Sequence, residues 1–241
     1  MPSGTLYGIG VGPGDPELIT LKGIKVLGYV DVVFAASSTK NRYSLAVNIA
    51  SRYLRKDTPV ELLGFPMTRD PEKLKEAWRE NALRVMKPLK EGKNVAFLTL
   101  GDPLTYSTFG YVMQTLRRED PNLSIKIVPG ITSYQAAAAA AGWVLAEAEE
   151  SLAVISGVLG AERLKEVVDS VDSIVMLKVY RRYEEILLDL EELGLLGHSV
   201  LVSNCGREGE KIVRDLKKHR LDDLGYLSLL LIKKPNKVKH P

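Results

Sequence analysis

Short runs of apolar residues alternate with longer segments of helical period along almost the whole chain. Short β-branched and aromatic runs bounded by turn residues are typical of strands, and apolar residues three and four apart are typical of helices. We predict strands at residues 6–11, 31–36, 60–65, 94–100, 124–128, 152–156, 173–179, 199–203 and 226–232. Because helical segments separate most of them, the pattern favours parallel sheets covered by helices, and the predicted fold class is α/β.

Two helix starts and one helix interior stand out in the polar pattern. The triplets at residues 15–17 and 70–72 are both Asp-Pro-Glu, which supplies an N-cap carboxylate, a proline at the first helical position and an acid in the first turn. The alanines at residues 136–141 follow Thr132 and Ser133 and predict a further helix, whose small side chains permit close approach of a ligand or a neighbouring backbone.

The best candidate for a domain boundary is the polar, proline-bearing segment RREDPNL at residues 117–123. It divides the chain into two predicted α/β domains, residues 1–117 and residues 118–232. The remaining residues, 233–241, contain four lysines and no acid, and we predict a disordered basic tail there.

Charge alone first suggests a nucleic-acid partner. The 241 residues include 33 Lys and Arg against 30 Asp and Glu, a net charge of +3. Without the tail, however, 29 basic residues face 30 acidic ones. The body of the protein therefore has no basic excess, and we expect neither nucleic acid nor membrane as a partner.

Cysteine content and apolar runs indicate the compartment. Cys205 is the single cysteine, so no intrachain disulfide can form, which suits a reducing compartment. The longest apolar run, residues 136–146, is much shorter than the roughly 20 residues that span a bilayer. The N-terminus lacks the basic and leucine-rich regions of a signal peptide. We expect a cytoplasmic protein.

Three glycine-rich turns follow predicted strands, at residues 8–15 (GIGVGPGD), 101–108 (GDPLTYST) and 129–133 (PGITS). The first turn matches neither the dinucleotide pattern G-x-G-x-x-G nor the phosphate loop G-x-x-x-x-G-K-[ST]. In open α/β sheets, ligands bind beyond the carboxyl ends of strands. Each turn alone is explained equally well as a tight connection, but the three together suggest an uncharged or zwitterionic, nucleoside-like ligand.

Three longer stretches resemble the tetrapyrrole methylase family, whose members methylate intermediates of cobalamin and sirohaem synthesis with S-adenosylmethionine. They are GIGVGPGDPELITLKG at residues 8–23, LTLGDPLTYSTFGY at residues 98–111 and VPGITSYQAAAAAAGWVLAE at residues 128–147. The LGDPxxYST form, FPMTRDPEKLKEAW from residue 65 and VMLKVYRR from residue 175 are most similar to the branch that methylates C20 of precorrin-2 or cobalt-factor II.

The resemblance implies two α/β domains of the class III methyltransferase type with the cofactor cleft between them, and a homodimer. It implies S-adenosylmethionine as the methyl donor, S-adenosylhomocysteine as the product and an acidic tetrapyrrole as the substrate. The cofactor-binding residues that it implies are Pro13, Gly101, Asp102, Thr105, Tyr106, Thr132, Ser133, Leu177 and Cys205.

Methyl transfer from a sulfonium needs positioning in a water-poor site rather than an enzyme nucleophile. Asp102 is the candidate base for the proton that the methylated carbon loses, and its alternative role is to form and cap its turn. Cations near strand ends could position the substrate carboxylates or could simply be solvated surface charges. These candidates are Lys178, Arg42 and Arg181, with Lys40, Arg182 and Arg207 beside them.

Other functional classes have weaker support. The three histidines lie far apart and lack partners at ligand spacing, so we expect no protein-bound metal. The chain also lacks the G-x-S-x-G pattern of serine hydrolases. A methylase of the same fold that resembles diphthine synthase, or a non-catalytic nucleoside-binding sensor, remains the alternative to a tetrapyrrole C-methyltransferase.

Overall fold

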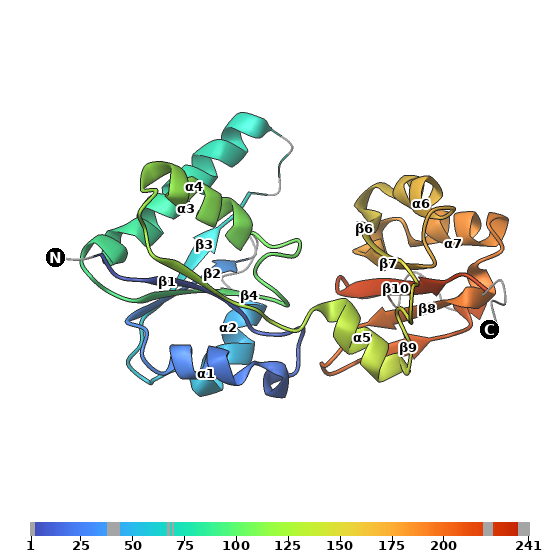
Figure 1. Cartoon of the computed structure of the whole chain (residues 1–241), viewed down its shortest axis with the longest axis horizontal. Coiled ribbons are helices and arrows are strands. Elements are labelled where there is room, and N and C mark those ends of the chain that lie inside the picture. The colour runs from blue at the N-terminus through green and yellow to red at the C-terminus, as the bar shows by residue number, and fades with distance from the viewer. Residues whose placement is uncertain (1–2, 38–43, 67, 69, 219–223, 236–241) are drawn as a thin grey trace. The chain divides into compact units, whose positions relative to one another are not determined.

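The computed structural model describes residues 3–37, 44–66, 68, 70–218 and 224–235. The chain forms two compact units, the first ending at Thr132 and the second beginning at Ser133. Each unit contains one five-stranded sheet with helices packed against it (Figure 1).

The sheet of the first unit is entirely parallel, as the alternation of strands and helices predicts. Its spatial order is β3-β2-β4-β1-β5, so the first and fourth strands lie at its centre and every residue of both is buried. The five strands are β1 (Leu6–Gly10), β2 (Val32–Ser37), β3 (Val60–Gly64), β4 (Val95–Thr99) and β5 (Ile125–Val128).

Helices cover both faces of this sheet (Figure 1). The α-helices are α1 (Leu21–Leu27), α2 (Leu45–Ala50), α3 (Pro71–Lys90) and α4 (Phe109–Glu119), and the short 3₁₀ helices are η1 (Pro16–Leu18) and η2 (Ser51–Tyr53). The helices α1 and α2 pack on a core that contains Ile9 and Leu98. The helices α3 and α4 pack on a second core around Phe34, Phe97 and Phe109. Because alternate strand residues point to opposite faces, one apolar strand supplies both cores.

The two predicted helix starts behave differently. Asp70 caps α3 as predicted, with its Oδ1 accepting hydrogen bonds from the backbone N–H groups of Glu72 (3.0 Å) and Lys73 (3.3 Å). Asp15 also accepts from a backbone N–H two residues later, at 2.8 Å, but only the 3₁₀ helix η1 follows. The α-helix α1 begins at Leu21, because Thr20 Oγ1 accepts from Gly23 N (3.1 Å) and caps a new helix.

The sheet of the second unit is mixed, and here the prediction of a parallel sheet is wrong. Its spatial order is β6-β7-β10-β8-β9, with β6 and β7 parallel, β10 antiparallel to both of its neighbours, and β9 antiparallel to β8. The strands are β6 (Leu152–Ser156), β7 (Ser173–Leu177), β8 (Ser199–Ser203), β9 (Lys211–Val213) and β10 (Ser228–Lys233). The strand β9 was not predicted, because its three residues carry too short a pattern. The link from β8 to β9 is too short for the crossover that a parallel pair requires.

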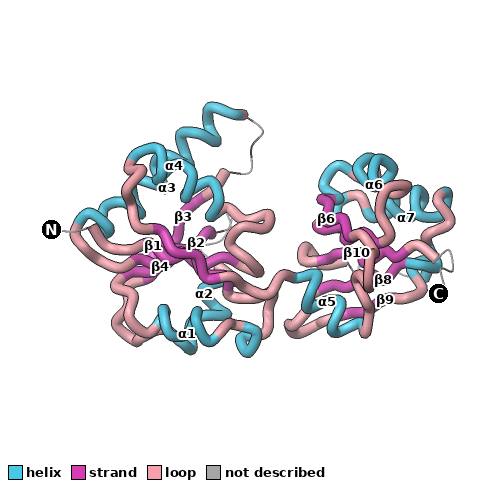
Figure 2. The backbone as a smooth tube through the Cα atoms, viewed as in Figure 1, coloured by secondary structure: helices cyan, strands magenta, loops and turns pink. Residues whose placement is uncertain are grey.

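The helices of the second unit also lie on both faces of its sheet (Figures 1 and 2). They are α5 (Ser133–Ala141), α6 (Glu162–Val167) and α7 (Tyr183–Glu192), with the 3₁₀ helices η3 (Gly157–Leu159), η4 (Val179–Arg181), η5 (Leu196–His198) and η6 (Leu216–Lys218). The alanine-rich segment is helical as predicted, and it contacts β8 and β10. The core between the sheet and the helices α6 and α7 contains Met176, Tyr183, Ile186 and Leu230.

The division between the units lies later than residues 117–123. The strand β5 pairs with β1 in the first sheet, with Ile125 opposite Leu6, so the segment after Arg117 still belongs to the first unit. The predicted tail also begins later, because Lys233 is the last residue of β10 and the backbone N–H of Lys234 donates to Asp172 O (3.0 Å). Residues 236–241 lie outside the described part of the chain.

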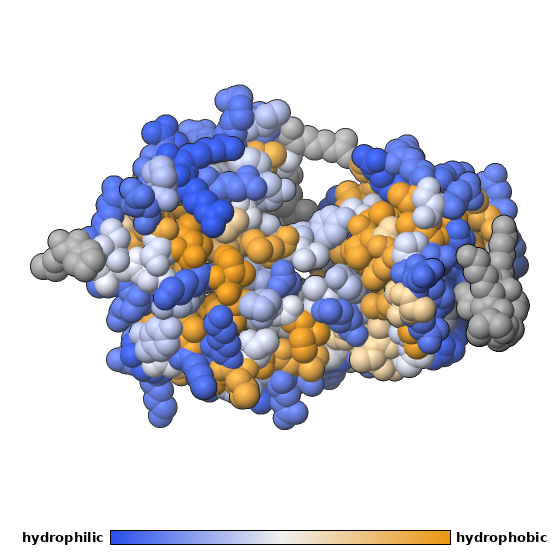
Figure 3. Space-filling model, viewed as in Figure 1, coloured by the Kyte–Doolittle hydropathy of each residue, from blue (hydrophilic) through white to orange (hydrophobic). Residues whose placement is uncertain are grey.

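Hydrophilic and hydrophobic side chains are interspersed over the face of the molecule that Figure 3 shows. Among the helices that the structure describes, none combines the length and the apolar character needed to cross a membrane.

Candidate functional site

The three glycine-rich turns of the sequence meet at the carboxyl edge of the first sheet, because β4, β1 and β5 are neighbours in its order. The first two turns pair directly through their backbones. Gly101 N donates to Gly12 O (2.8 Å), and Gly12 N donates to Gly101 O (3.3 Å). Two turns that are far apart in the sequence are therefore joined through their backbones.

Glycine is required at the centre of this junction because two backbones approach each other closely. A Cβ atom on Gly130 would lie 2.1 Å from Gly101 O and 2.7 Å from Gly10 Cα. A Cβ atom on Gly10 would lie 2.4 Å from the same Gly101 oxygen. Both neighbours are backbone atoms, which cannot move aside as a flexible side chain could.

On its other side Gly101 has room for a methyl group, although the residue is buried. This residue has a left-handed backbone with φ of +68°, and a Cβ built on it would find no atom nearer than 3.9 Å. The atoms at that distance belong to Ile131 and Thr132 of the third turn. Glycine is therefore required at this position for its left-handed backbone rather than by crowding.

Asp102 joins the second turn to the third. Its Oδ1 accepts hydrogen bonds from Leu104 N (2.9 Å) and Thr105 Oγ1 (3.4 Å), and its Oδ2 accepts from Gly130 N (3.1 Å). The turn-forming role predicted for Asp102 is confirmed. Because both carboxylate oxygens accept bonds, the side chain is held in one orientation.

The second turn continues into α4 through a pair of hydroxyl groups. Ser107 Oγ lies 2.8 Å from Thr99 Oγ1 and accepts a hydrogen bond from Phe109 N (3.2 Å) at the start of the helix. Tyr106, immediately before, has a left-handed φ of +51° and is half-exposed. Sequence reasoning selected Tyr106 but missed Ser107, although a serine two residues before a helix is a recognisable capping signal.

The candidate residues of the second unit gather at the ends of β7 and β8. Leu177 is the last residue of β7, and Lys178 follows it with a left-handed φ of +60°. Asn204, directly after β8, also has a positive φ of +52°. Left-handed backbone costs about 1–2 kcal/mol at a residue with a side chain, and such strain is concentrated at functional sites.

Cys205 follows Asn204 and is buried. Burial and the nearby Glu210 carboxylate raise the pKa of its thiol to about 12. The Glu210 carboxylate itself accepts a hydrogen bond from Gly206 N (2.6 Å). The thiol is therefore protonated at neutral pH, which agrees with a packing or contact role rather than a nucleophilic one.

The other predicted residues fall into three groups. Pro13 and Thr132 lie on the turns of the first unit, and Ser133 is the first residue of α5. Arg181 lies in η4, close to the end of β7, and its neighbour Arg182 forms an ion pair with Glu185 (2.8 Å). Lys40 and Arg42 lie outside the residues that the structure describes.

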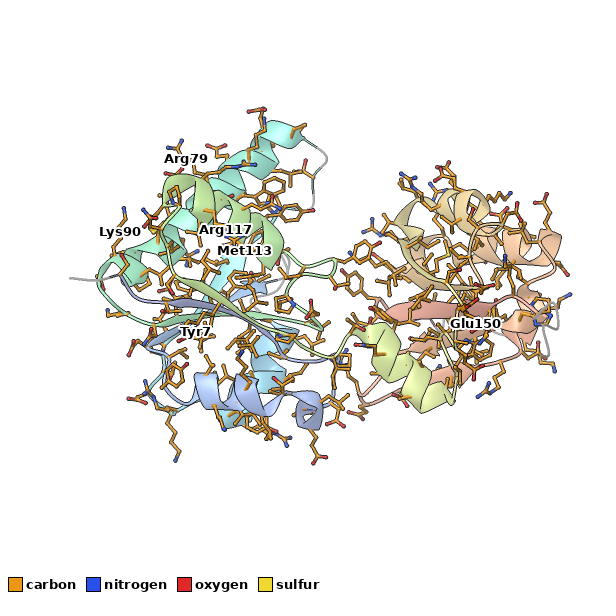
Figure 4. All side chains as sticks on the ribbon, in the orientation of Figure 1. Tyr7, Arg79, Lys90, Met113, Arg117 and Glu150 are labelled. Carbon is orange, nitrogen blue, oxygen red and sulfur yellow. The ribbon has the colours of Figure 1, made fainter. Side chains whose placement is uncertain are left out.

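One lysine that sequence reasoning placed in the tail has an internal role. Lys233 Nζ donates to the Oε2 atom of Glu150 (2.8 Å), the acid labelled on the second unit in Figure 4. This bond from Lys233, followed by the one that Glu147 N donates, lowers the pKa of the Glu150 carboxyl below its ordinary value. In the described part of the chain, no three His, Cys, Asp or Glu side chains are grouped as a metal site would require.

Known proteins are similar to this chain in sequence. The sequence profile of the Tetrapyrrole (Corrin/Porphyrin) Methylases matches residues 5–218. The cobalt-precorrin-2 C(20)-methyltransferase of Salmonella typhimurium is 35% identical over 96% of this chain and 97% of its own length. The probable cobalt-precorrin-2 C(20)-methyltransferase of Methanocaldococcus jannaschii is 38% identical over 95% of this chain and 96% of its own length.

Solved structures of methyltransferases are similar to this chain in fold. The structure of a cobalt precorrin-4 methyltransferase has a TM-score of 0.71 and 27% identity, covering 95% of this chain and 94% of its own. The uroporphyrin-III C-methyl transferase of Thermus thermophilus, complexed with S-adenosyl homocysteine, has a TM-score of 0.68 and 23% identity over 95% and 92%. The latter shows the same fold. With the profile matching most of the sequence, this chain belongs to the tetrapyrrole (corrin/porphyrin) methylase family.

Proposed function

We propose that this protein transfers a methyl group from S-adenosylmethionine to C20 of a precorrin-2-type tetrapyrrole in cobalamin biosynthesis. The observation that carries the proposal is similarity over nearly the full length of two C(20)-methyltransferases, at 35% and 38% identity. Both are named for the cobalt form of the substrate, whereas the precorrin-2 C(20)-methyltransferase of Sinorhizobium is 29% identical. We therefore propose the cobalt-bearing macrocycle as the substrate, with the cobalt belonging to it.

The glycine backbone of the second turn is the feature that fits the cofactor. S-adenosylmethionine would supply the methyl group as a sulfonium. Its nucleoside and amino-acid parts need hydrogen-bonding groups without a phosphate cradle, and the bare backbone beside Ile131 and Thr132 has this character. The residues that the family resemblance assigns to the cofactor, and that we propose to hold it, are Pro13, Gly101, Asp102, Thr105, Tyr106, Thr132, Ser133, Leu177 and Cys205.

The chain's own groups would act mainly by positioning. The backbone bonds between Gly12 and Gly101 and the Asp102 bond to Gly130 N hold the turns in one arrangement before any ligand binds. Such preorganisation lowers the entropic cost of aligning the methyl donor with the acceptor carbon. We keep Asp102 as the proposed acceptor of the proton that C20 loses, while its bonds to the neighbouring turns give it a structural role as well.

A homodimer and a cytoplasmic location complete the proposal, and both rest on the family resemblance. Sedimentation velocity on the purified protein tests the first. A single species at the monomer mass across micromolar concentrations would contradict the dimer.

The decisive experiment is methylation followed by mass spectrometry. We expect incubation with S-adenosylmethionine and cobalt-factor II to add one methyl group to the macrocycle, and precorrin-2 to react more slowly. Absence of a methyl gain on either macrocycle would overturn the proposed function. A faster reaction with precorrin-2 would overturn the cobalt preference alone.

A further inference from the structure

Two tyrosines and an arginine form a cluster on the second unit that the cofactor assignment does not use. Tyr180 and Arg181 lie in η4, just after β7, and Tyr226 lies just before β10. The end of β7 and the start of β10 are neighbours because these strands are antiparallel, with Leu229 opposite Leu177. We call these three residues the Tyr180–Arg181–Tyr226 cluster.

The cluster is held in a defined geometry. The two tyrosine rings pack edge to face, with centroids 5.1 Å apart and an interplanar angle of 60°. Arg181 Nε donates a hydrogen bond to Tyr180 Oη (2.6 Å), and its Cζ lies 5.5 Å from the centroid of the same ring. The Tyr180 ring is therefore held both by the hydrogen bond from Arg181 and by its packing against the Tyr226 ring.

Much of this fixed surface is open. Tyr226 is 59% exposed, Tyr180 is partly exposed, and the Arg181 side chain is exposed as well. Among the residues that the structure describes, no carboxylate lies within ion-pair distance of Arg181. The adjacent Arg182 differs, because Glu185 neutralises it at 2.8 Å. Among the described residues, therefore, Arg182 is paired with a carboxylate and Arg181 is not.

The position of the cluster also connects it to the proposed reaction site. Tyr226 is three residues before Leu229, whose cross-strand partner is Leu177, and Ser228 is opposite Ser203 at the end of β8. The strained residues Lys178 and Asn204 follow these two strand ends directly. The cluster therefore lies at the same sheet edge as the second unit's proposed cofactor residues.

We propose that the Tyr180–Arg181–Tyr226 cluster binds the tetrapyrrole substrate, with the exposed tyrosine surface contacting a flat pyrrole ring and the Arg181 guanidinium pairing with a peripheral carboxylate. A planar ring combined with a carboxylate is the chemistry that an exposed aromatic pair and an adjacent exposed arginine recognise together. The cofactor also has a flat adenine and an α-carboxylate, so the Kd of S-adenosylhomocysteine is the measurement that separates the two ligands. The inference rests on the proposed methyltransferase function and names residues that would set its affinity for substrate.

Steady-state kinetics combined with cofactor binding tests this assignment. The variants are Tyr226→Ala, Tyr226→Phe and Arg181→Gln, measured for the KM of cobalt-factor II and, by calorimetry, for the Kd of S-adenosylhomocysteine. We expect Tyr226→Ala and Arg181→Gln each to raise the KM about tenfold, the size of one lost aromatic or charged contact. We expect Tyr226→Phe to stay within about twofold of the wild type, and the Kd of S-adenosylhomocysteine to change less than about twofold in every variant.

Two control variants change comparable side chains elsewhere in the chain. Tyr29 packs edge to face on Tyr7, which is labelled in Figure 4, with centroids 5.8 Å apart. Tyr29 lies just before the amino end of β2, away from the carboxyl edge of the first sheet where the glycine turns lie. Arg163 is an exposed arginine paired with Glu166 on α6. Tyr29→Ala and Arg163→Gln should leave the KM unchanged.

The outcomes separate this inference from the proposed function. A wild-type enzyme that methylates neither macrocycle overturns the proposed function. An active wild type with an unchanged KM in both Tyr226→Ala and Arg181→Gln overturns the inference alone. Weaker S-adenosylhomocysteine binding with an unchanged KM also overturns it, because the tyrosines would then serve the adenosine. Should Tyr226→Ala not fold, the exposed Arg181→Gln still decides the matter.

Discussion

The two units build their strand-end sites from different material. In the first unit, three glycine turns pack backbone against backbone, with Gly130 and Gly10 too close to Gly101 for any side chain. In the second unit, the corresponding ends of β7 and β8 carry Lys178 and Asn204, residues with side chains in left-handed backbone. The glycine turns of the first unit present peptide groups without side chains. The strand ends of the second unit present side chains on a strained, left-handed backbone.

This difference separates the two tasks that methyl transfer requires. Bare, rigid peptide groups suit a ligand that must always be held in one position, as a cofactor is. Partly buried side chains such as those of Lys178 and Asn204 suit contacts with a large acidic substrate that differs among related enzymes. The predictions below test this contrast, beginning with the change expected to have the largest effect.

Gly130→Ala should be the most damaging single change in the first unit. The added Cβ would lie 2.1 Å from a carbonyl oxygen, so we expect a loss of about 3 kcal/mol in the free energy of unfolding, together with loss of activity. Urea denaturation measures it. Gly110→Ala is the control, because its Cβ meets nothing within 4 Å in α4 and should leave stability equal or higher. Equal stabilities of the two variants would contradict the close packing of the turns.

Asp102→Asn should come next. An amide can accept bonds on one side only, so either Leu104 N or Gly130 N would face an NH₂ group, and we expect a loss of about 1–2 kcal/mol. Cofactor binding and activity should fall because the turns would lose the bond that holds them together. Asp120→Asn is the matched control, since Asp120 accepts one bond from Asn122 N (3.0 Å) that an amide oxygen can keep. Unchanged stability and unchanged kinetics in Asp102→Asn would contradict the role of the carboxylate.

Lys178→Gly should raise stability and lower activity. Glycine relieves the left-handed strain, so we expect the free energy of unfolding to rise by about 1 kcal/mol, while loss of the ammonium group lowers turnover. The control is Ala148→Gly, at another positive φ of +45°, which should gain similar stability without losing activity. If Lys178→Gly kept full activity, its strain would have no functional purpose in this reaction.

The smallest effect concerns Cys205. Since its folded pKa is raised from 9.0 to about 12, the thiol contributes stability that is fully present below about pH 9 and is lost as the pH rises towards 12. At pH 8, iodoacetamide should alkylate the native thiol far more slowly than the denatured one. Glu210→Gln should speed the native reaction, because one cause of the raised pKa is removed. Rapid native alkylation would contradict the burial of this thiol.

Much of the fold could be predicted from local patterns. The strands β6 and β8 have the predicted bounds, and α3 begins at its Asp-Pro-Glu cap, because apolar periodicity and capping act over a few residues. The Asp-Pro-Glu at residues 15–17 produced only a 3₁₀ turn because a competing cap at Thr20 follows it. The strand β9 and the direction of β10 depended on pairing partners, which no local pattern encodes.

The site shows the same limit. The glycine turns and Asp102 were recognisable as motifs in the sequence. That Asp102 bonds to Gly130, 28 positions away, was not, and neither was the packing of Tyr226 on Tyr180. Both contacts join strand ends that become neighbours only through sheet order.

The family, the α/β class of both halves, most strand positions and the glycine-rich turns could be recognised from the amino-acid sequence, because these depend on residue type and short-range spacing. Which turns touch, where the first unit ends and which residues are strained became evident in the folded chain. The physical reason is that hydrogen bonds between strands and close backbone contacts join residues far apart in the chain. Their energies depend on the assembled sheet rather than on any local segment.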